Sequence, residues 1–127
     1  MTLNIGQLNE KWAKILVKEM IHQGVRYFCI SPGLRSSPLI FAVKENPLAK
    51  VFVHFDERGM AFHALGYAKA TQLPVALITT SGTALGNILP AIMEADSDEI
   101  PLVVLTADRP PELRSSGANQ TTNQVKI

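Results

Sequence analysis

Three short polar clusters in this chain contain residue types that can bind and activate a ligand. They occupy residues 31–33, 54–59 and 80–83, and each follows an apolar run that predicts a buried strand. The second cluster contains Glu57, a carboxylate that can hold or exchange a proton with a bound molecule when its surroundings are partly apolar. Because ligands of open parallel α/β sheets bind at the carboxyl ends of the strands, we expect the three clusters to form one site.

The acidic pair Asp56 and Glu57 also has a purely structural interpretation. Acidic residues in the first turn of a helix interact favourably with the helix dipole, by roughly 0.3–1 kcal/mol. Capping needs only one acidic side chain, whereas this pair follows Phe55 and precedes a helix rich in small residues. We therefore favour a chemical role for Glu57, and helix capping is the alternative.

The glycine-containing turns of the first and third clusters suit either a tight turn or a ligand contact. In the ligand-binding interpretation, backbone amides near Gly33 and Gly82 face an anion or a cofactor ring at a helix N-terminus. The sequence contains neither Gly-x-x-x-x-Gly-Lys-Ser/Thr nor Gly-x-Gly-x-x-Gly. The common fingerprints of phosphate-binding loops and of dinucleotide-binding folds are therefore excluded.

Two arginines, Arg35 and Arg109, lie just past predicted strand ends. A pair of guanidinium groups facing one crevice suits a substrate with carboxylates, which the planar group binds through two parallel hydrogen bonds. Solvated loop arginines are the alternative. The three histidines have no metal-like spacing to one another or to Cys29, so we expect no metal site. Cys29 lies in an apolar run and is expected to be a buried thiol rather than a nucleophile.

The composition is that of an ordinary globular chain. Of the 127 residues, 46% are hydrophobic and 18% are charged, which fits one domain at most. The net charge of +1 gives no reason to expect a nucleic-acid partner. We expect neither a leader peptide nor a membrane span, and therefore a cytoplasmic protein.

Apolar periodicity predicts helices and short strands that alternate along the chain. We predict helices over residues 6–23, 37–45, 57–71 and 83–95, and strands over residues 25–30, 51–53, 75–79 and 101–106. Such alternation predicts right-handed crossovers and a parallel sheet between two helix layers, a three-layer α/β/α fold. Pro90 is expected to kink the last of these helices. A sheet this small has an uncovered edge, which would favour dimerisation or aggregation.

Five motifs, in order and at matching spacing, resemble a known enzyme family. They are SPGLRS (31–36), HFDERG (54–59), TSGTA (80–84), TADRPPEL (106–113) and GANQ (117–120). The chain is similar to the 2-succinyl-5-enolpyruvyl-6-hydroxy-3-cyclohexene-1-carboxylate synthases of menaquinone biosynthesis, which are thiamine-diphosphate-dependent carboligases. The resemblance covers essentially all of residues 1–127 and implies the N-terminal, pyrimidine-binding domain. It also implies that this domain is incomplete and that the middle and diphosphate-binding domains are absent.

The resemblance implies a transferase that decarboxylates 2-oxoglutarate and adds the succinyl unit to isochorismate. Glu57 matches the family glutamate that hydrogen-bonds N1′ of the cofactor's aminopyrimidine ring. The cofactors implied are thiamine diphosphate and Mg²⁺, with the metal ligands in the absent domain. The resemblance further implies cofactor contacts from Pro32, Gly33, Ser81 and Gly82, and substrate contacts from Arg35, Arg109, Asn119 and Gln120.

One departure from the family pattern is Leu34, where the family usually has a serine whose hydroxyl can donate a hydrogen bond. We expect the isolated chain to be inactive, and to need a homo-oligomer or the missing domains of the same enzyme for a complete site. Two other interpretations stay open. The chain is a non-catalytic α/β module that associates through its small-residue helix, or it belongs to another thiamine enzyme, such as an acetolactate synthase or an oxo-acid decarboxylase.

Overall fold

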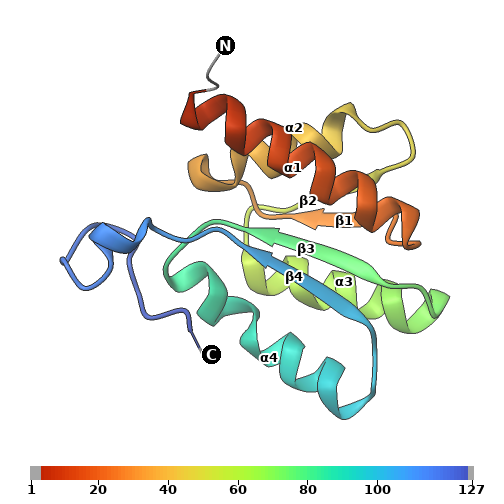
Figure 1. Ribbon diagram of the computed structural model, residues 1–127. Helices are drawn as coiled ribbons and strands as arrows, with labels where there is room; N and C mark the ends of the chain where they lie inside the picture. Colours follow the sequence, from red (N-terminus) through yellow and green to blue (C-terminus); the bar gives the residue numbers. More distant parts are fainter. Residues whose placement is uncertain (1–3, 126–127) are drawn as a thin grey trace.

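The computed structural model describes residues 4–125, which form a parallel sheet between two layers of helices (Figure 1). The helices are α1 (Ile5–His22), α2 (Ser37–Glu45), α3 (Glu57–Thr71) and α4 (Thr83–Ser97); the strands are β1 (Tyr27–Ile30), β2 (Lys50–Val53), β3 (Val75–Thr79) and β4 (Leu102–Thr106). Two 3-10 turns, η1 (Leu34–Ser36) and η2 (Pro111–Leu113), follow β1 and β4. The predicted three-layer α/β/α fold is confirmed.

The order of strands in the sheet is β2-β1-β3-β4, and all of the pairs are parallel. The chain leaves β1 in one direction to form β2 and then crosses back to form β3 on the other side of β1. This reversal creates a topological switch point between the carboxyl ends of β1 and β3. Ligands of open α/β sheets bind in the crevice at such a point.

Alternate residues of the central strands point to opposite helix layers. Phe28 and Ile78 belong to the core that also contains buried residues of α1 and α2. Cys29 and Leu77 belong to the other core, with α3 and α4. Because helices cover both faces, β3 is buried along its whole length, as its almost wholly apolar sequence predicts.

The predicted element boundaries differ from the observed ones by only a few residues. The first strand begins at Tyr27 rather than at Val25, because the Val25 amide donates to the Met20 carbonyl and closes the end of α1. The helix that contains Pro90, α4, ends at Ser97, two residues after its predicted end. Both 3-10 turns were missed by the apolar pattern, which is informative only over longer segments.

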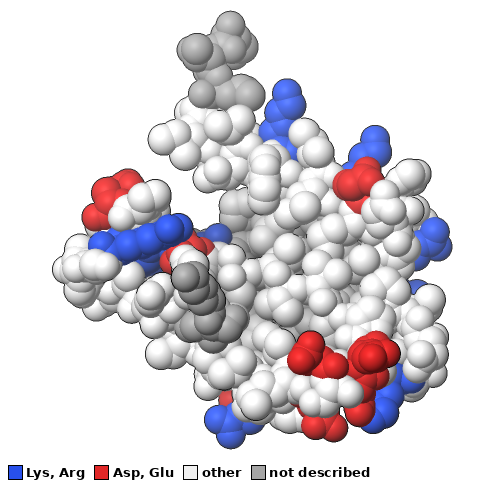
Figure 2. Space-filling view, turned by 60° about the horizontal axis from the view of Figure 1, so that its bottom comes forward, with Lys and Arg blue, Asp and Glu red and all other residues white. Residues whose placement is uncertain are grey.

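The two edges of the sheet are more exposed than its centre. All residues of β4 are half-buried, and within β2 Val51 and Val53 are exposed. On the face shown in Figure 2, Lys and Arg side chains lie scattered around the rim.

Among residues 4–125, no helix combines the length and the apolar character needed to cross a membrane.

Candidate active site

Glu57 is the first residue of α3, four residues after the end of β2, and among residues 4–125 its side chain makes no capping hydrogen bond. The cap is Asp56, whose Oδ1 accepts a hydrogen bond from the Gly59 amide at 2.9 Å. The half-buried Glu57 side chain instead reaches α4, where its Oε2 accepts a hydrogen bond from Asn87 Nδ2 at 3.1 Å. Asp56 therefore supplies the capping hydrogen bond, while Glu57 keeps the first-turn position that suits the helix dipole and also contacts α4.

This division of roles predicts different effects of the two carboxylates on stability. We expect Asp56→Ala to lower the free energy of unfolding by about 1 kcal/mol, the usual cost of losing an N-cap. Glu57→Gln should lower it by less, about 0.3 kcal/mol at the lower end of a helix-dipole interaction, because a glutamine oxygen can still accept the hydrogen bond from Asn87. Urea unfolding of both variants measures this, and an equal loss in the two variants would contradict the assignment.

The Phe55 side chain does not shield Glu57 within this chain. It is 92% exposed and stacks on the His54 ring, with the two ring centroids 4.8 Å apart. The sequence suggested apolar surroundings on both sides of Glu57, and this expectation is wrong for the Phe55 side. The reason is that β2 is an edge strand, so no further element of the described chain covers the residues that follow it.

The loops at the switch point are in direct contact. A Cβ atom added to Gly33 would lie 2.4 Å from Thr80 Cβ, so only glycine allows the loops after β1 and β3 to approach this closely. Gly82 has a φ of 82°, and a Cβ there would lie 3.0 Å from the Gln120 carbonyl carbon. Pro32, the other predicted cofactor contact of the first cluster, is exposed.

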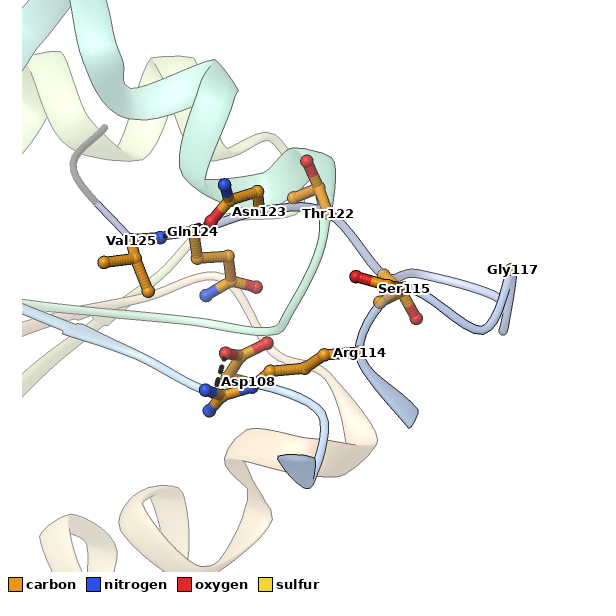
Figure 3. Close-up of a pocket in the computed structure, with 9 residues that line it drawn as sticks. Asp108, Arg114, Ser115, Gly117, Thr122, Asn123, Gln124 and Val125 are labelled. Carbon is orange, nitrogen blue, oxygen red and sulfur yellow. Dashed lines mark hydrogen bonds and ion pairs between the residues drawn. The ribbon is translucent and has the colours of Figure 1, made fainter. Parts of the chain in front are cut away.

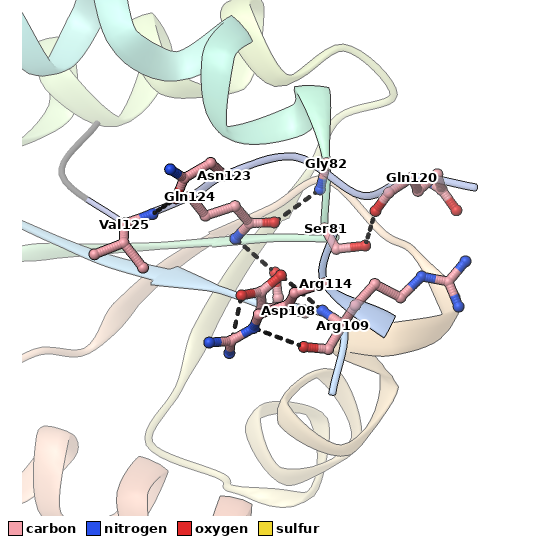
Figure 4. Close-up of polar contacts among 10 residues, drawn as sticks. Ser81, Gly82, Asp108, Arg109, Arg114, Gln120, Asn123, Gln124 and Val125 are labelled. Carbon is pink, nitrogen blue, oxygen red and sulfur yellow. Dashed lines mark hydrogen bonds and ion pairs between the residues drawn. The ribbon is translucent and has the colours of Figure 1, made fainter. Parts of the chain in front are cut away.

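The tail that follows η2 lies across the carboxyl ends of β3 and β4 (Figure 4). Ser81 Oγ donates to the Gln120 carbonyl at 2.9 Å, and the Gly82 amide donates to Gln124 Oε1 at 2.8 Å. Gln124 Nε2 in turn donates to the Ala107 carbonyl at 3.0 Å. Gln124 therefore joins the loops after β3 and β4.

The four predicted substrate residues form two hydrogen-bonded pairs. Arg35 Nη1 donates to Gln120 Oε1 at 2.7 Å, and Arg109 Nε donates to the Asn119 carbonyl at 3.0 Å. In both pairs the guanidinium group of the arginine donates a hydrogen bond to an uncharged oxygen of the tail.

Two cavities lie beside this group. The first, of about 320 Å³, lies between the tail and the loop after β4, and its walls include Asp108, Arg114 and Gln124 (Figure 3). Asp108 and Arg114 form an ion pair there at 3.1 Å. The second, of about 240 Å³, is lined in part by Arg35. Glu57 does not line either of these two cavities.

The histidines near Glu57 and the cysteine are held by structural contacts. Tyr27 Oη lies 3.0 Å from His63 Nε2, and His54 Nδ1 accepts a hydrogen bond from the Asp56 amide. Burial raises the pKa of Cys29 to about 12, so the thiolate is not available near neutrality. The prediction of a buried, unreactive thiol agrees with this position.

Comparison with known proteins gives the family. The model of the N-terminal TPP-binding domain of thiamine pyrophosphate enzymes matches residues 10–127. The chain belongs to this family.

Curated relatives of this thiamine pyrophosphate-binding domain are much longer than the chain. A protein of Rubrobacter xylanophilus named 2-succinyl-5-enolpyruvyl-6-hydroxy-3-cyclohexene-1-carboxylate synthase is 57% identical over 94% of this chain, which corresponds to 21% of the relative. A Salinibacter ruber protein of the same name is 53% identical over 91% of this chain and 20% of its own length. Protein PHYLLO, chloroplastic, of Arabidopsis thaliana is 51% identical over 94% of this chain and 7% of its own length. The chain thus spans about a fifth of the length of the synthases it matches.

The residues of this TPP-binding domain fit a bound cofactor at two points. Glu57 Oε2 accepts a hydrogen bond from Asn87. Among residues 4–125, no group donates a hydrogen bond to the other carboxylate oxygen of Glu57, Oε1. At the switch point, the buried Thr80 hydroxyl has no hydrogen-bond partner in the described chain. A buried hydroxyl without a partner costs about 1–3 kcal/mol, so a polar ligand group placed here would stabilise it.

Sequence reasoning missed several residues of this TPP-binding domain that organise the candidate site. Asn87 lies within a helix and was hidden among apolar residues, while Gln124 lies in a tail without periodicity. The ion pair of Asp108 and Arg114 was also missed. Asn87 follows the TSGTA motif by three residues, and this proximity to a glycine-containing loop was the only signal available for it.

Proposed function

We propose that this chain supplies the pyrimidine-binding part of a thiamine-diphosphate-dependent carboligase of menaquinone biosynthesis. In this proposal the whole enzyme decarboxylates 2-oxoglutarate and adds the succinyl unit to isochorismate. The support from the comparisons is that the Rubrobacter and Salinibacter relatives are named as synthases of the 2-succinyl cyclohexene carboxylate product. The observation that carries the proposal is the Glu57 carboxylate, which is half-buried and which, among residues 4–125, makes no capping hydrogen bond and accepts one hydrogen bond, from Asn87.

In this proposal, Glu57 binds N1′ of the cofactor's aminopyrimidine ring through Oε1 and holds a proton there. Thiamine diphosphate, when bound, supplies the carbanion chemistry by which an oxo acid is decarboxylated and its acyl unit transferred. Gly33, Ser81 and Gly82 shape the crevice on the switch-point side, with Pro32 at its exposed rim. The close contact of Gly33 with Thr80 supports this placement, whereas the Ser81 hydroxyl and the Gly82 amide already donate to Gln120 and Gln124 of the tail.

Arg35 and Arg109 bind the carboxylates of the substrate, and Asn119 and Gln120 line the same pocket. The support for this assignment is that each guanidinium group already holds an oxygen of the tail. A charged carboxylate forms a stronger hydrogen bond to arginine than an amide or carbonyl oxygen does. Binding of substrate would therefore exchange the tail oxygens for carboxylate oxygens.

We propose that Mg²⁺ and the diphosphate group are bound by parts of the enzyme outside this chain, and that a second copy or further domains complete the site. The support is the length of the relatives, of which the chain covers about a fifth. The exposed Phe55 beside Glu57 is available for contact with such a partner.

A chimeric synthase tests the proposed substrates. In it, this chain replaces the matching 119-residue stretch of the Rubrobacter xylanophilus relative. With thiamine diphosphate and Mg²⁺, we expect carbon dioxide release from 2-oxoglutarate and product formation only when isochorismate is present. The unmodified relative is the positive control. Turnover of pyruvate in place of 2-oxoglutarate would indicate another thiamine enzyme, and a folded chimera without turnover of either would favour the non-catalytic module.

A further inference from the structure

We propose that Asn87 is a positioning residue for Glu57: by donating to Oε2, it directs Oε1 towards the cofactor ring. This inference rests on the proposed function, because it assigns a role in the same site to a residue that neither the motifs nor the comparisons single out. It follows from the hydrogen bond between α3 and α4 at the base of the carboxylate.

The position of Asn87 is fixed by the packing of α4 rather than by its own side chain. The residues on either side of it along the buried face of α4, Ala84, Ile88 and Ala91, are at most 4% exposed. Ile88 and Ala91 belong to the core cluster that contains the buried alanines of α3, and the two helices run side by side beneath the sheet (Figure 1). An amide on such a rigid element has a defined direction relative to the start of α3.

The Glu57 side chain, by contrast, begins at the first residue of its helix and has several rotatable bonds. A carboxylate of this kind needs an anchor to present one oxygen in a constant direction, because loose groups lose much of the advantage of a preorganised site. Asn87 supplies the anchor through a single oxygen. The second oxygen stays available for a ring nitrogen.

The chemistry of the donor also fits a carboxylate that shares a proton. A lysine or arginine at this position would add a positive charge beside Glu57 and hold it as the anion. An amide donates a hydrogen bond without adding charge, so it supports Glu57 both as a carboxylate and as a proton-sharing partner. The pair of Glu57 and Asn87 is therefore suited to binding N1′, whereas an ion pair would not be.

The test uses three variants of the chimeric synthase. Asn87→Leu keeps the size of the side chain and removes the hydrogen-bond donor, and Asn87→Asp keeps its shape and replaces the donor by an acceptor. Asn87→Gln keeps a donor but places it on a longer side chain. We expect the Kd for thiamine diphosphate, measured by calorimetry, to rise about 10-fold or more in the first two, since a hydrogen bond to a charged group is lost. Asn87→Asp should be the more severe because two carboxylates then face each other, and Asn87→Gln should recover part of the affinity. Ser97→Ala, which removes a different side-chain hydrogen bond of α4, is the matched control and should leave the Kd unchanged.

Two further readouts separate positioning from a merely structural role. The circular dichroism of the bound cofactor, which reports the protonation state of its aminopyrimidine ring, should change in Asn87→Leu and not in Ser97→Ala. In a Glu57→Gln background, Asn87→Leu should have little additional effect on turnover, because its effect passes through the carboxylate. An unchanged cofactor spectrum, or full additivity of the two substitutions, would overturn the proposal.

The outcome can be distinguished from failure of the proposed function. If the chimera binds cofactor but does not form product from isochorismate, the function is wrong, while the Kd and the spectrum still decide the role of Asn87. The other case is that the chimera forms product and that Glu57→Gln abolishes product formation. If Asn87→Leu then keeps the cofactor affinity, the cofactor spectrum and the turnover of the parent, the proposed function is supported and the positioning role of Asn87 is refuted.

Discussion

Glu57→Gln is expected to lower the turnover of the chimeric synthase by about 10²- to 10⁴-fold, the usual contribution of a positioned proton-transfer group. The variant keeps the length of the side chain but replaces one carboxylate oxygen by an amide, so it cannot take up or share a proton at N1′. Its folded structure should be preserved, because Asp56 rather than Glu57 caps α3. Steady-state rates of product formation at saturating cofactor measure the effect.

The matched control for this variant is Glu10→Gln, at an exposed position of α1. It makes the same chemical change away from the carboxyl ends of the strands. Because ordinary surface substitutions have small effects, turnover should stay within about twofold of that of the parent. Near-normal turnover of Glu57→Gln would remove the basis of the enzymatic proposal. The chain would then be better described as an association module.

Gly33→Ala is expected to lower the free energy of unfolding by about 1–3 kcal/mol, the usual cost of forcing extra atoms into a packed region. The new methyl group would lie 2.4 Å from Thr80 Cβ and would have to push the loops after β1 and β3 apart. Because both loops belong to the candidate site, substrate affinity of the chimera should fall as well. Denaturant unfolding of the 127-residue chain measures the stability term.

Gly66→Ala serves as the opposite control. Gly66 lies inside α3, and apart from its chain neighbours and the nearby backbone of its own helix, no described atom lies within 4 Å of the position that its Cβ would take. Alanine is favoured over glycine in a helix interior by roughly 0.5–1 kcal/mol, so this variant should be more stable than the parent. If both substitutions changed stability in the same direction, close contact at Gly33 would not be the cause.

Most of the fold could be predicted because local patterns determine it. The almost wholly apolar sequence of β3 indicated a strand covered on both faces, and Asn46-Pro47 and Pro74 marked the ends of helices. The start of β1 could not be predicted, since a single backbone bond from Val25 to Met20 decides it. That bond depends on how α1 ends in three dimensions.

The candidate site was only partly predictable because its contacts connect distant residues. The motifs located Glu57, Ser81, Gly82, Arg35 and Arg109, and the order of strands brings them to the end of the sheet where the carboxyl ends of the strands lie. The hydrogen-bond partner of each side chain depends on residues far away in the sequence. The bond of Asn87 to Glu57 depends on the packing of two helices, and the bonds of Gln124 depend on the path of the tail. The roles in binding cofactor and substrate stay predictions carried by the family resemblance.

The pairing of β1 has a consequence for synthesis of the protein. Tyr27 pairs with Lys50 on one side and with Val75 on the other, so one side of this strand stays open until β3 has been translated. A nascent chain that stalls before β3 therefore exposes a row of unpaired backbone groups beside apolar side chains, the form most prone to misassembly. We expect early ribosome-bound intermediates to depend on chaperones, and this dependence to end once β3 has docked against β1.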